Sequence, residues 1–402
     1  MKRICLVVVG IFIQLFGAFA QVKDSSAYQS RKLKLEEINF VSSYYTQDGS
    51  NSAVTGGVGT EKLTDYSNNF EVKYIKAGKH GRKVQLDMNL GVDYYTSASS
   101  DRIDPNTISS ASSRDLRIYP SFSRKVINEV KGSSFSTHLS YSHESDYRSY
   151  GIGAGISKMS PNRNRELTVR AQLYIDWVKM ILPIELRDAS TGGVTGAPNQ
   201  YDYPWSSRKT FSTSFSFSQV LNQRLQLSWL LDLTYQHGFL GLPFHRVYLK
   251  DNLLRTETLP SSRYKIPLGI RASYFLGDQI ILRPLYRFYK DDWGLNAHTA
   301  ELETVFKITP FVSVSPFYRY YRQTAIDFFA PYLQHDQTDI YYSSNYDLSA
   351  FHSQFFGTGF RWAPPKGLFG LKRWSAVEIR YGHYKRSNGL SADIISLQLK
   401  YK

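Results

Sequence analysis

The chain is nearly free of cysteine, and this scarcity excludes two ways of stabilising a protein. Its one cysteine, Cys5, lies in the first twenty residues, which we predict to be removed after export. The rest of the chain can then form no disulfide framework and no thiolate metal site.

Long apolar runs are absent beyond the N-terminus, so no later segment approaches the ~20 uncharged apolar residues of a membrane helix. The N-terminus has a basic start, an apolar run over residues 6–19 and a small-x-small cleavage site that ends at Ala20. We therefore predict a signal peptide at residues 1–20, followed by a periplasmic tail at residues 21–34.

Enzyme motifs are missing as well. The sequence contains no Gly-x-Ser-x-Gly elbow, no phosphate-binding Walker loop, no His-Glu-x-x-His and no dinucleotide fingerprint. Six histidines fall on predicted strands without the spacing of metal ligands: His138, His143, His237, His298, His352 and His383. We predict no catalytic, cofactor-binding or metal-ligating residues and no enzyme activity. A membrane-embedded hydrolase that assembles its groups from several strands stays open as a third alternative.

Positive charge exceeds negative charge, with a formal net charge of +15 at pH 7. A basic balance favours anionic partners. Nucleic acid is a poor candidate for an exported chain without a recognisable binding module, so we expect no nucleic-acid partner. Lipid headgroups are the simpler anionic partner.

The sequence does contain a regular alternation of apolar and polar residues, clearest over residues 211–218 and 225–235. In an extended chain, a period of two places the apolar side chains on one face and the polar ones on the other. Segments of ~10 residues with this pattern are typical of outer-membrane β-barrels, which close because lipid cannot hydrogen-bond a sheet edge. We expect strands near residues 36–47, 66–76, 82–97, 113–126, 133–145, 148–159, 165–179, 207–219, 223–237, 262–275, 279–290, 297–308, 311–325, 350–363, 372–385 and 390–401.

The composition agrees with a barrel. Aromatic residues make up 15% of the chain, yet its mean hydropathy is negative. A barrel needs apolar residues toward lipid, aromatic girdles at both interfaces and a polar lumen. A soluble β-sandwich would alternate too, but it would not need so many aromatic residues.

The connections between the predicted strands are alternately short and long, and this fixes an orientation. Short turns fall at residues 78–81, 161–164, 221–223, 276–278 and 309–310, and long loops at 48–65, 98–112, 180–206, 238–261 and 326–349. Short turns face the periplasm and long loops face outside in this class. We predict an all-β fold in the bacterial outer membrane: a transmembrane antiparallel β-barrel of about 16 strands over residues 35–402. Its partners would include outer-membrane lipids and the barrel-insertion machinery.

Charged residues recur on the inward faces of four neighbouring predicted strands. Opposite charges on adjacent strands can compensate one another as a structural ladder. Arginine forks can also hold an anionic solute at a constriction, and the sequence leaves both interpretations open. The candidate lumen charges are Arg271, Arg283, Arg287, Glu301, Glu303 and Arg319.

Basic residues also gather at the predicted periplasmic ends of the strands. They can contact anionic headgroups and extend from the membrane interface. A sharper alternative is that a periplasmic protein docks on this rim. The candidate periplasmic rim consists of Lys79, Arg82, Lys125, Arg163 and Lys372.

Three glycines, Gly151, Gly153 and Gly155, fall on one inward face of a predicted strand. They carry no side chain, so the wall can bend there or another group can lie close against it.

Several loop phrases resemble a bacterial family known as domain of unknown function 3570. They are residues 44–49 (YYTQDG), 55–61 (TGGVGTE), 91–101 (GVDYYTSASSD), 241–248 (GLPFHRVY) and 330–332 (APY). The resemblance covers nearly the whole exported chain and implies an outer-membrane barrel with no assigned activity. It also implies a possible partner in an exported redox or flavin system, because relatives accompany a flavin-transferring lipoprotein and a thioredoxin-like protein.

A barrel of about sixteen strands is wide enough to leave an aqueous channel. We therefore expect a channel or transport component for small polar solutes. The alternative is an outer-membrane scaffold or binding protein with a blocked lumen, which would partner a periplasmic system such as the flavin or redox system that the resemblance implies.

Overall fold

The computed structural model describes residues 32–78, 81–96, 114–187 and 203–402. The predicted signal peptide and residues 21–31 of the predicted tail lie outside the described residues. Among the described residues, no helix is long and apolar enough to cross a membrane.

Sixteen antiparallel strands form one closed barrel in which each strand pairs with its sequence neighbours. The barrel closes where β1 pairs with β18, from Ile38 opposite Tyr401 to Asp48 opposite Ser391. The strands are β1 (Lys34–Asp48), β2 (Leu63–Ala77), β3 (Arg82–Thr96), β4 (Arg114–Asn128), β5 (Ser133–His143), β6 (Tyr147–Met159), β7 (Arg165–Lys179), β8 (Trp205–Asn222), β9 (Leu225–Gly238), β12 (Ser262–Leu276), β13 (Ile280–Asp291), β14 (Asn296–Thr309), β15 (Val312–Gln323), β16 (Phe351–Trp362), β17 (Trp374–Arg386) and β18 (Ser391–Tyr401).

Alternation along the strands separates an apolar outer surface from a polar lumen. Met88 and Tyr94 of β3 are exposed on the outer face, as are Leu167 and Trp177 of β7 and Leu268 of β12. A closed barrel leaves no unpaired sheet edge, and an apolar outer face suits lipid, so the protein is an outer-membrane barrel.

The opposite parity faces the lumen, where polar side chains bond to one another across strands. The Asn69 amide of β2 donates to the Asn89 side-chain oxygen of β3 over 2.9 Å. The Asn39 amide of β1 donates in the same way to the Glu71 carboxylate of β2 over 3.0 Å.

The structure confirms the predicted fold, with strand ends that differ from the predicted ones by a few residues. The short elements of the loops were not predicted. The loop after β9 contains a small hairpin of β10 (Arg246–Tyr248) and β11 (Leu254–Thr256), which form a separate two-stranded sheet. Strands of three residues carry too little alternation to be recognised in a sequence.

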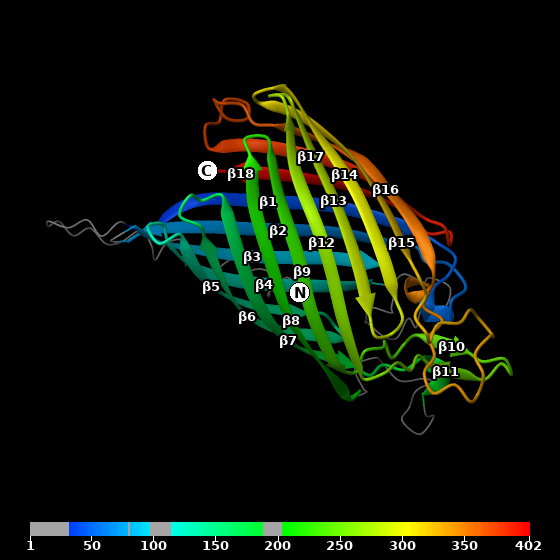
Figure 1. Ribbon diagram of the computed structural model, residues 1–402. Coiled ribbons are helices and arrows are strands. Elements are labelled where there is room, and N and C mark those ends of the chain that lie inside the picture. The colour runs from blue at the N-terminus through cyan, green and yellow to red at the C-terminus, as the bar shows by residue number, and fades with distance from the viewer. Residues whose placement is uncertain (1–31, 79–80, 97–113, 188–202) are drawn as a thin grey trace.

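The long loops meet at one end of the barrel. Figure 1 shows the β10–β11 hairpin and the loop between β15 and β16 beyond the strand ends, opposite the short turns. In the described parts of these loops, the structure has the short 3-10 helices η1 (Ala53–Thr55), η2 (Ile184–Leu186) and η5 (Tyr346–Leu348).

Candidate functional site

One wall of the lumen carries a network of ion pairs. Arg283 of β13 lies 3.2 Å from the Glu303 carboxylate of β14. Arg319 of β15 lies 2.5 Å from the Glu301 carboxylate, which is also on β14. Four of the six predicted lumen charges are therefore brought together in pairs on three neighbouring strands.

A fifth residue, Arg380 of β17, joins this network across two intervening strands, β15 and β16. Its Nη2 atom lies 2.6 Å from Glu303 Oε1 and its Nη1 atom 3.6 Å from Glu378 Oε1. The guanidinium also lies over the Phe317 ring, 5.6 Å from its centroid. The sequence analysis missed Arg380, although the alternation of β17 does mark it as inward. No local pattern shows that a side chain reaches over two strands.

The two remaining predicted charges do not join this network. Arg287 of β13 lies 3.5 Å from the Asp232 carboxylate of β9, on the far side of β12. Arg271 of β12 lies opposite Ser228 and Leu285 in the sheet, and no ion pair within 4.0 Å involves it among the described residues. The role of all six residues as a solute site remains a prediction.

The predicted rim residues occupy different positions. Arg82, Arg163 and Lys372 are exposed at the short-turn end of the barrel, whereas Lys79 lies outside the described residues. Lys125 pairs with Gln85 and Ser136 in the sheet, so its side chain shares the inward parity of the lumen wall.

The opposite wall, formed by β4 to β8, is rich in hydroxyl groups and glycine. It contains a hollow of about 480 Å³. This volume is within the usual range for a small-molecule site. The residues that line the hollow include Asn89, Tyr119, Ser121, Ser140, Tyr174 and Thr210.

Two tyrosine rings lie flat on this wall because each is opposite a glycine. A Cβ atom on Gly91 would lie 2.0 Å from the Tyr119 ring, and one on Gly151 would lie 2.7 Å from Tyr174 Cε1. Gly91 pairs with Tyr119, and Gly151 with Tyr174, directly across neighbouring strands. For the predicted glycine row, the sequence left two interpretations open: a bend in the wall, or the close approach of another group. At Gly151 the Tyr174 side chain approaches closely.

The charged groups at the edge of the hollow are compensated. Asp176 accepts hydrogen bonds from Ser149 over 2.7 Å and from Arg208 over 3.0 Å. Arg117 donates to the Ser142 hydroxyl over 3.0 Å and lies 3.5 Å from a Glu144 oxygen. The hollow therefore presents neutral polar groups to a solute.

The extracellular loops pack together into a cap, which we define as residues 49–62, 239–261 and 324–350. Val247 and Leu249 are fully buried in it, and Tyr342 packs with them as a core cluster. Backbone hydrogen bonds join the second and third loops, with Thr258 and Tyr342 each donating to the carbonyl of the other. The cap is thus a folded unit with its own apolar core.

A buried arginine connects the cap loops. Arg246 donates from Nη1 to the Val54 carbonyl over 2.7 Å and from Nη2 to the Glu185 carboxylate over 2.7 Å. These two partners belong to the loops after β1 and β7, so Arg246 holds three extracellular loops in one arrangement.

A buried glutamate forms a second connection in the cap. Glu257 lies 3.3 Å from the His245 imidazole and accepts hydrogen bonds from the Leu242 amide, over 3.1 Å, and the Ser343 hydroxyl. Burial opposes its ionisation, but the His245 imidazole and these hydrogen bonds outweigh burial and hold the pKa of Glu257 below its usual range.

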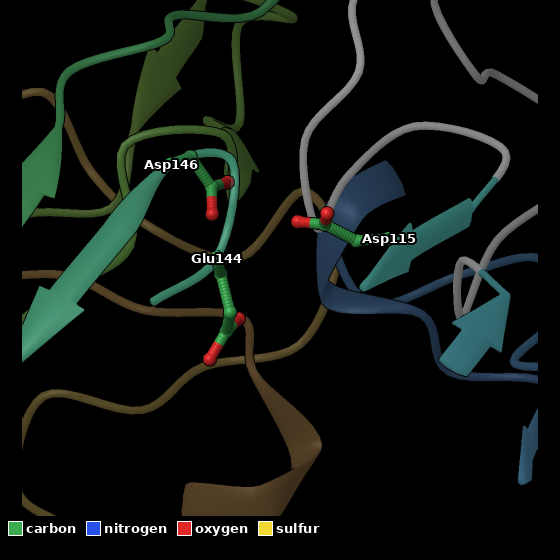
Figure 2. Close-up of side chains that lie close together, drawn as sticks. All are labelled: Asp115, Glu144 and Asp146. Atoms are coloured by element: carbon green, nitrogen blue, oxygen red, sulfur yellow. The ribbon is translucent and has the colours of Figure 1, made fainter. Parts of the chain in front are cut away.

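Three acidic side chains gather at the extracellular ends of β4, β5 and β6. Figure 2 shows Asp115 from the start of β4, with Glu144 and Asp146 from the β5–β6 loop. Their nearest oxygens lie within 4.8 Å of one another. Oxygen ligands of this kind suit a hard cation such as Ca²⁺. Two of these carboxylates already accept hydrogen bonds within the protein. The Ser145 hydroxyl donates to Asp115 and the Tyr95 hydroxyl donates to Glu144, each over 2.6 Å.

The crowding of these carboxylates affects their protonation. Burial raises the pKa of Glu144, and the nearby Asp146 and Asp115 raise it further, whereas Tyr95 and Arg117 lower it less than these effects raise it. The sequence analysis missed this cluster because its members come from separate segments without the spacing of a calcium loop.

The sequence matches the profile of one family, and solved structures of porins are similar in fold. The profile of the family described as "Protein of unknown function (DUF3570)" matches residues 105–387. Comparison with curated proteins gives no match. Solved structures with a similar fold include OccK1 (OpdK) of Pseudomonas aeruginosa, at 8% identity and a TM-score of 0.41, with 91% of this chain and 97% of that chain covered. A BenF-like porin of Pseudomonas fluorescens has 9% identity, a TM-score of 0.41 and the same two coverages.

Proposed function

The chain belongs to the DUF3570 family, and from its own barrel we propose that it is an outer-membrane channel through which small polar solutes diffuse. A barrel of sixteen strands encloses more space than its inward side chains fill, whereas one of about eight strands does not.

The observation that supports a water-filled lumen is the exposure of its charged side chains. Arg283, Arg287 and Arg319 point inward, yet their side chains are 46%, 50% and 45% exposed. Water therefore reaches these groups from within the barrel, because the inward parity turns them away from the lipid.

Selection by the channel would rest on the two lumen walls. A solute diffuses past the cap and then between the ion-pair network and the wall rich in hydroxyl groups. The network presents both signs of charge, since Glu301 and Glu303 each pair with an arginine. We therefore expect weak ion selectivity and passage of neutral as well as charged small solutes.

Single-channel recording of the purified, refolded chain in a planar bilayer tests this proposal. Stable stepwise openings are the expected result. Silence from protein shown to be folded, by its heat-dependent migration on a gel, would overturn it.

A second candidate function, a scaffold with a blocked lumen, draws on an exposed feature at the periplasmic end. The turn between β16 and β17 presents Phe369, 87% exposed, and Leu371, 58% exposed. Phe369 stands edge-on against the Trp362 ring, with 5.5 Å between the ring centroids, and the nearby Lys372 is exposed. An apolar tip beside positive charge suits a protein partner with an acidic rim.

Pull-down from solubilised membranes distinguishes the two candidates. A scaffold should retain a periplasmic protein in stoichiometric amount and lose it in the Phe369→Ser variant. A bound flavin would identify a partner from a redox system by its absorbance. An open pore that retains no partner would rule out the scaffold.

A further inference from the structure

We propose that the hollow on the β4–β8 wall is a binding site for a neutral saccharide ring, with Tyr174 as its stacking surface. The inference rests on the proposed function, since it names the solute class that the lumen would select. It combines three observations: a flat aromatic ring, neutral hydroxyl groups that form no hydrogen bond within the described residues, and paired charges.

Tyr174 supplies the flat aromatic surface. Tyr119 and Tyr174 each lie over a glycine of the neighbouring strand, so both ring planes follow the wall. The Arg117 guanidinium lies over the Tyr119 ring, 4.8 Å from its centroid, so the ring face that is left for a solute is that of Tyr174. The Tyr119 ring is also fixed in place, because its hydroxyl donates to the Asp93 carboxylate over 3.0 Å. The face of an aromatic ring carries partial negative charge, and the C–H groups on one face of a pyranose are weakly positive.

Between the rings, the wall supplies neutral hydrogen-bonding groups. Ser140 of β5 lies opposite both Ser121 of β4 and Gly151 of β6. In the described part of the chain, no hydrogen bond is formed by the side-chain hydroxyls of Ser121, Ser140 or Tyr174. These hydroxyls can donate to and accept from sugar hydroxyls without first breaking a bond within the protein.

The charges near the hollow argue against an ionic solute. Asp176 is paired with Arg208 at 3.0 Å, and Arg117 lies 3.5 Å from Glu144. A carboxylate or ammonium in the hollow would lose hydration without finding a free counter-charge. The hollow therefore favours a neutral ring over a charged one.

Equilibrium titration of methyl α-glucopyranoside into the detergent-solubilised barrel measures binding without requiring flow, and galacturonate serves as the charged comparator. We expect saturable binding of the neutral sugar and weaker binding of galacturonate. Tyr174→Ala should weaken sugar binding about three- to tenfold, the scale of one lost aromatic contact. Tyr174→Phe should retain most of it.

Glycine substitutions test the ring geometry itself. A Cβ in Gly151→Ala would displace both the Ser140 hydroxyl and the Tyr174 ring, whereas Gly153→Ala places its Cβ 3.1 Å or more from its neighbours. We expect weaker binding in the first variant and near wild-type binding in the second. Tyr321→Ala, on the opposite wall, should also bind normally.

The outcomes separate this site from the channel proposal. Conductance without sugar binding, tighter binding of galacturonate, or equal loss in Gly151→Ala and Gly153→Ala would each overturn the saccharide site. Sugar binding that follows the expected variant pattern supports the site even in a barrel that does not conduct, and in that case it is the channel proposal that fails.

Discussion

Arg380 and Glu303 form an ion pair of 2.6 Å between Nη2 and Oε1 although β17 and β14 are not neighbours. Two strands, β15 and β16, lie between them, and β16 carries Gly359 on its inward face, where a Cβ would lie 3.3 Å from Arg380 Cγ and Nε. The arginine can therefore lie along the wall instead of pointing into the lumen. Glu303 becomes the shared counter-ion of Arg380 and Arg283, so its loss would leave Arg283 unpaired and Arg380 with Glu378 alone, at 3.6 Å.

The first prediction concerns this shared counter-ion. Glu303→Gln should make the channel more selective for anions, because Arg283 would then face the lumen without a carboxylate and Arg380 would keep only Glu378. A unit charge at 4 Å contributes about 1 kcal/mol in water, so we expect roughly a two- to fivefold change in the chloride-to-potassium permeability ratio. Reversal potentials in a salt gradient measure this ratio. Glu36→Gln, which removes the same charge at the exposed start of β1, should leave it unchanged.

The second prediction reverses the charge of two exposed lumen arginines. Arg283→Glu combined with Arg287→Glu should shift selectivity toward cations, because both side chains are about half exposed to the lumen. The shift should shrink in high salt, where the Debye length falls to about 3 Å. Reversal potentials that do not move at low salt would contradict a water-filled lumen at this wall.

The barrel itself could be predicted from the sequence because lipid and lumen impose opposite polarity on successive residues. Strands such as β7, predicted at residues 165–179 and observed at Arg165–Lys179, carry this pattern over their full length. Local alternation also placed Arg283 and Glu303 on the same face, and the register confirms that they are opposite one another.

The cap and the Arg380 contact could not be predicted, because they depend on groups far apart in the chain. Arg246 and Val54 are separated by 192 residues, and Arg380 and Glu303 by 77. The glycines that make room for Tyr119 and Tyr174 are visible in the sequence, but the partner that lies over each depends on strand register. Register is a property of pairs of strands, so one strand's pattern does not contain it.

The third prediction tests the connection between the cap loops. Arg246→Ala should loosen the cap by about 1–3 kcal/mol, since it removes charged hydrogen bonds to Val54 and Glu185. Faster cleavage of the loops by an added protease and more frequent current fluctuations are the expected readouts. Arg255→Ala removes an arginine from the same loop that is only half-buried, and should change neither. Unchanged cleavage of the Arg246 variant would mean that apolar packing alone holds the cap.

The fourth prediction concerns acid and the cap. The pKa of Glu257 is held below its usual range, so its ionised form contributes stability that is fully present above the unfolded-state pKa of about 4.3. That contribution is lost as the pH falls through the lower folded-state pKa. Amide hydrogen exchange in residues 239–261 should therefore accelerate below about pH 4, beyond the intrinsic effect of pH. In Glu257→Gln this extra acceleration should disappear and the cap should be less protected at pH 7.

The fifth prediction concerns the acidic cluster, where the pKa shift of Glu144 is opposite in sign to that of Glu257. The pKa of Glu144 is raised by burial and by the nearby Asp146 and Asp115. The folded state therefore binds the proton more tightly than the unfolded state, and stability falls as the pH rises from the usual carboxyl range through the raised pKa. Glu144→Gln removes this cost and still accepts the hydrogen bond from Tyr95. The variant should unfold at a higher temperature than the wild type at pH 7.

Heat-dependent gel migration across a pH series measures this difference. The two proteins should converge below about pH 4, where Glu144 is protonated in both states. Asp278→Asn, at an exposed periplasmic turn, removes one charge outside the cluster and should show no such dependence. A lower unfolding temperature for Glu144→Gln at pH 7 would show that the ionised carboxylate is held by Tyr95 and Arg117 more strongly than Asp115 and Asp146 repel it. The cluster would then stabilise the extracellular end of the barrel without a cation or a bound proton.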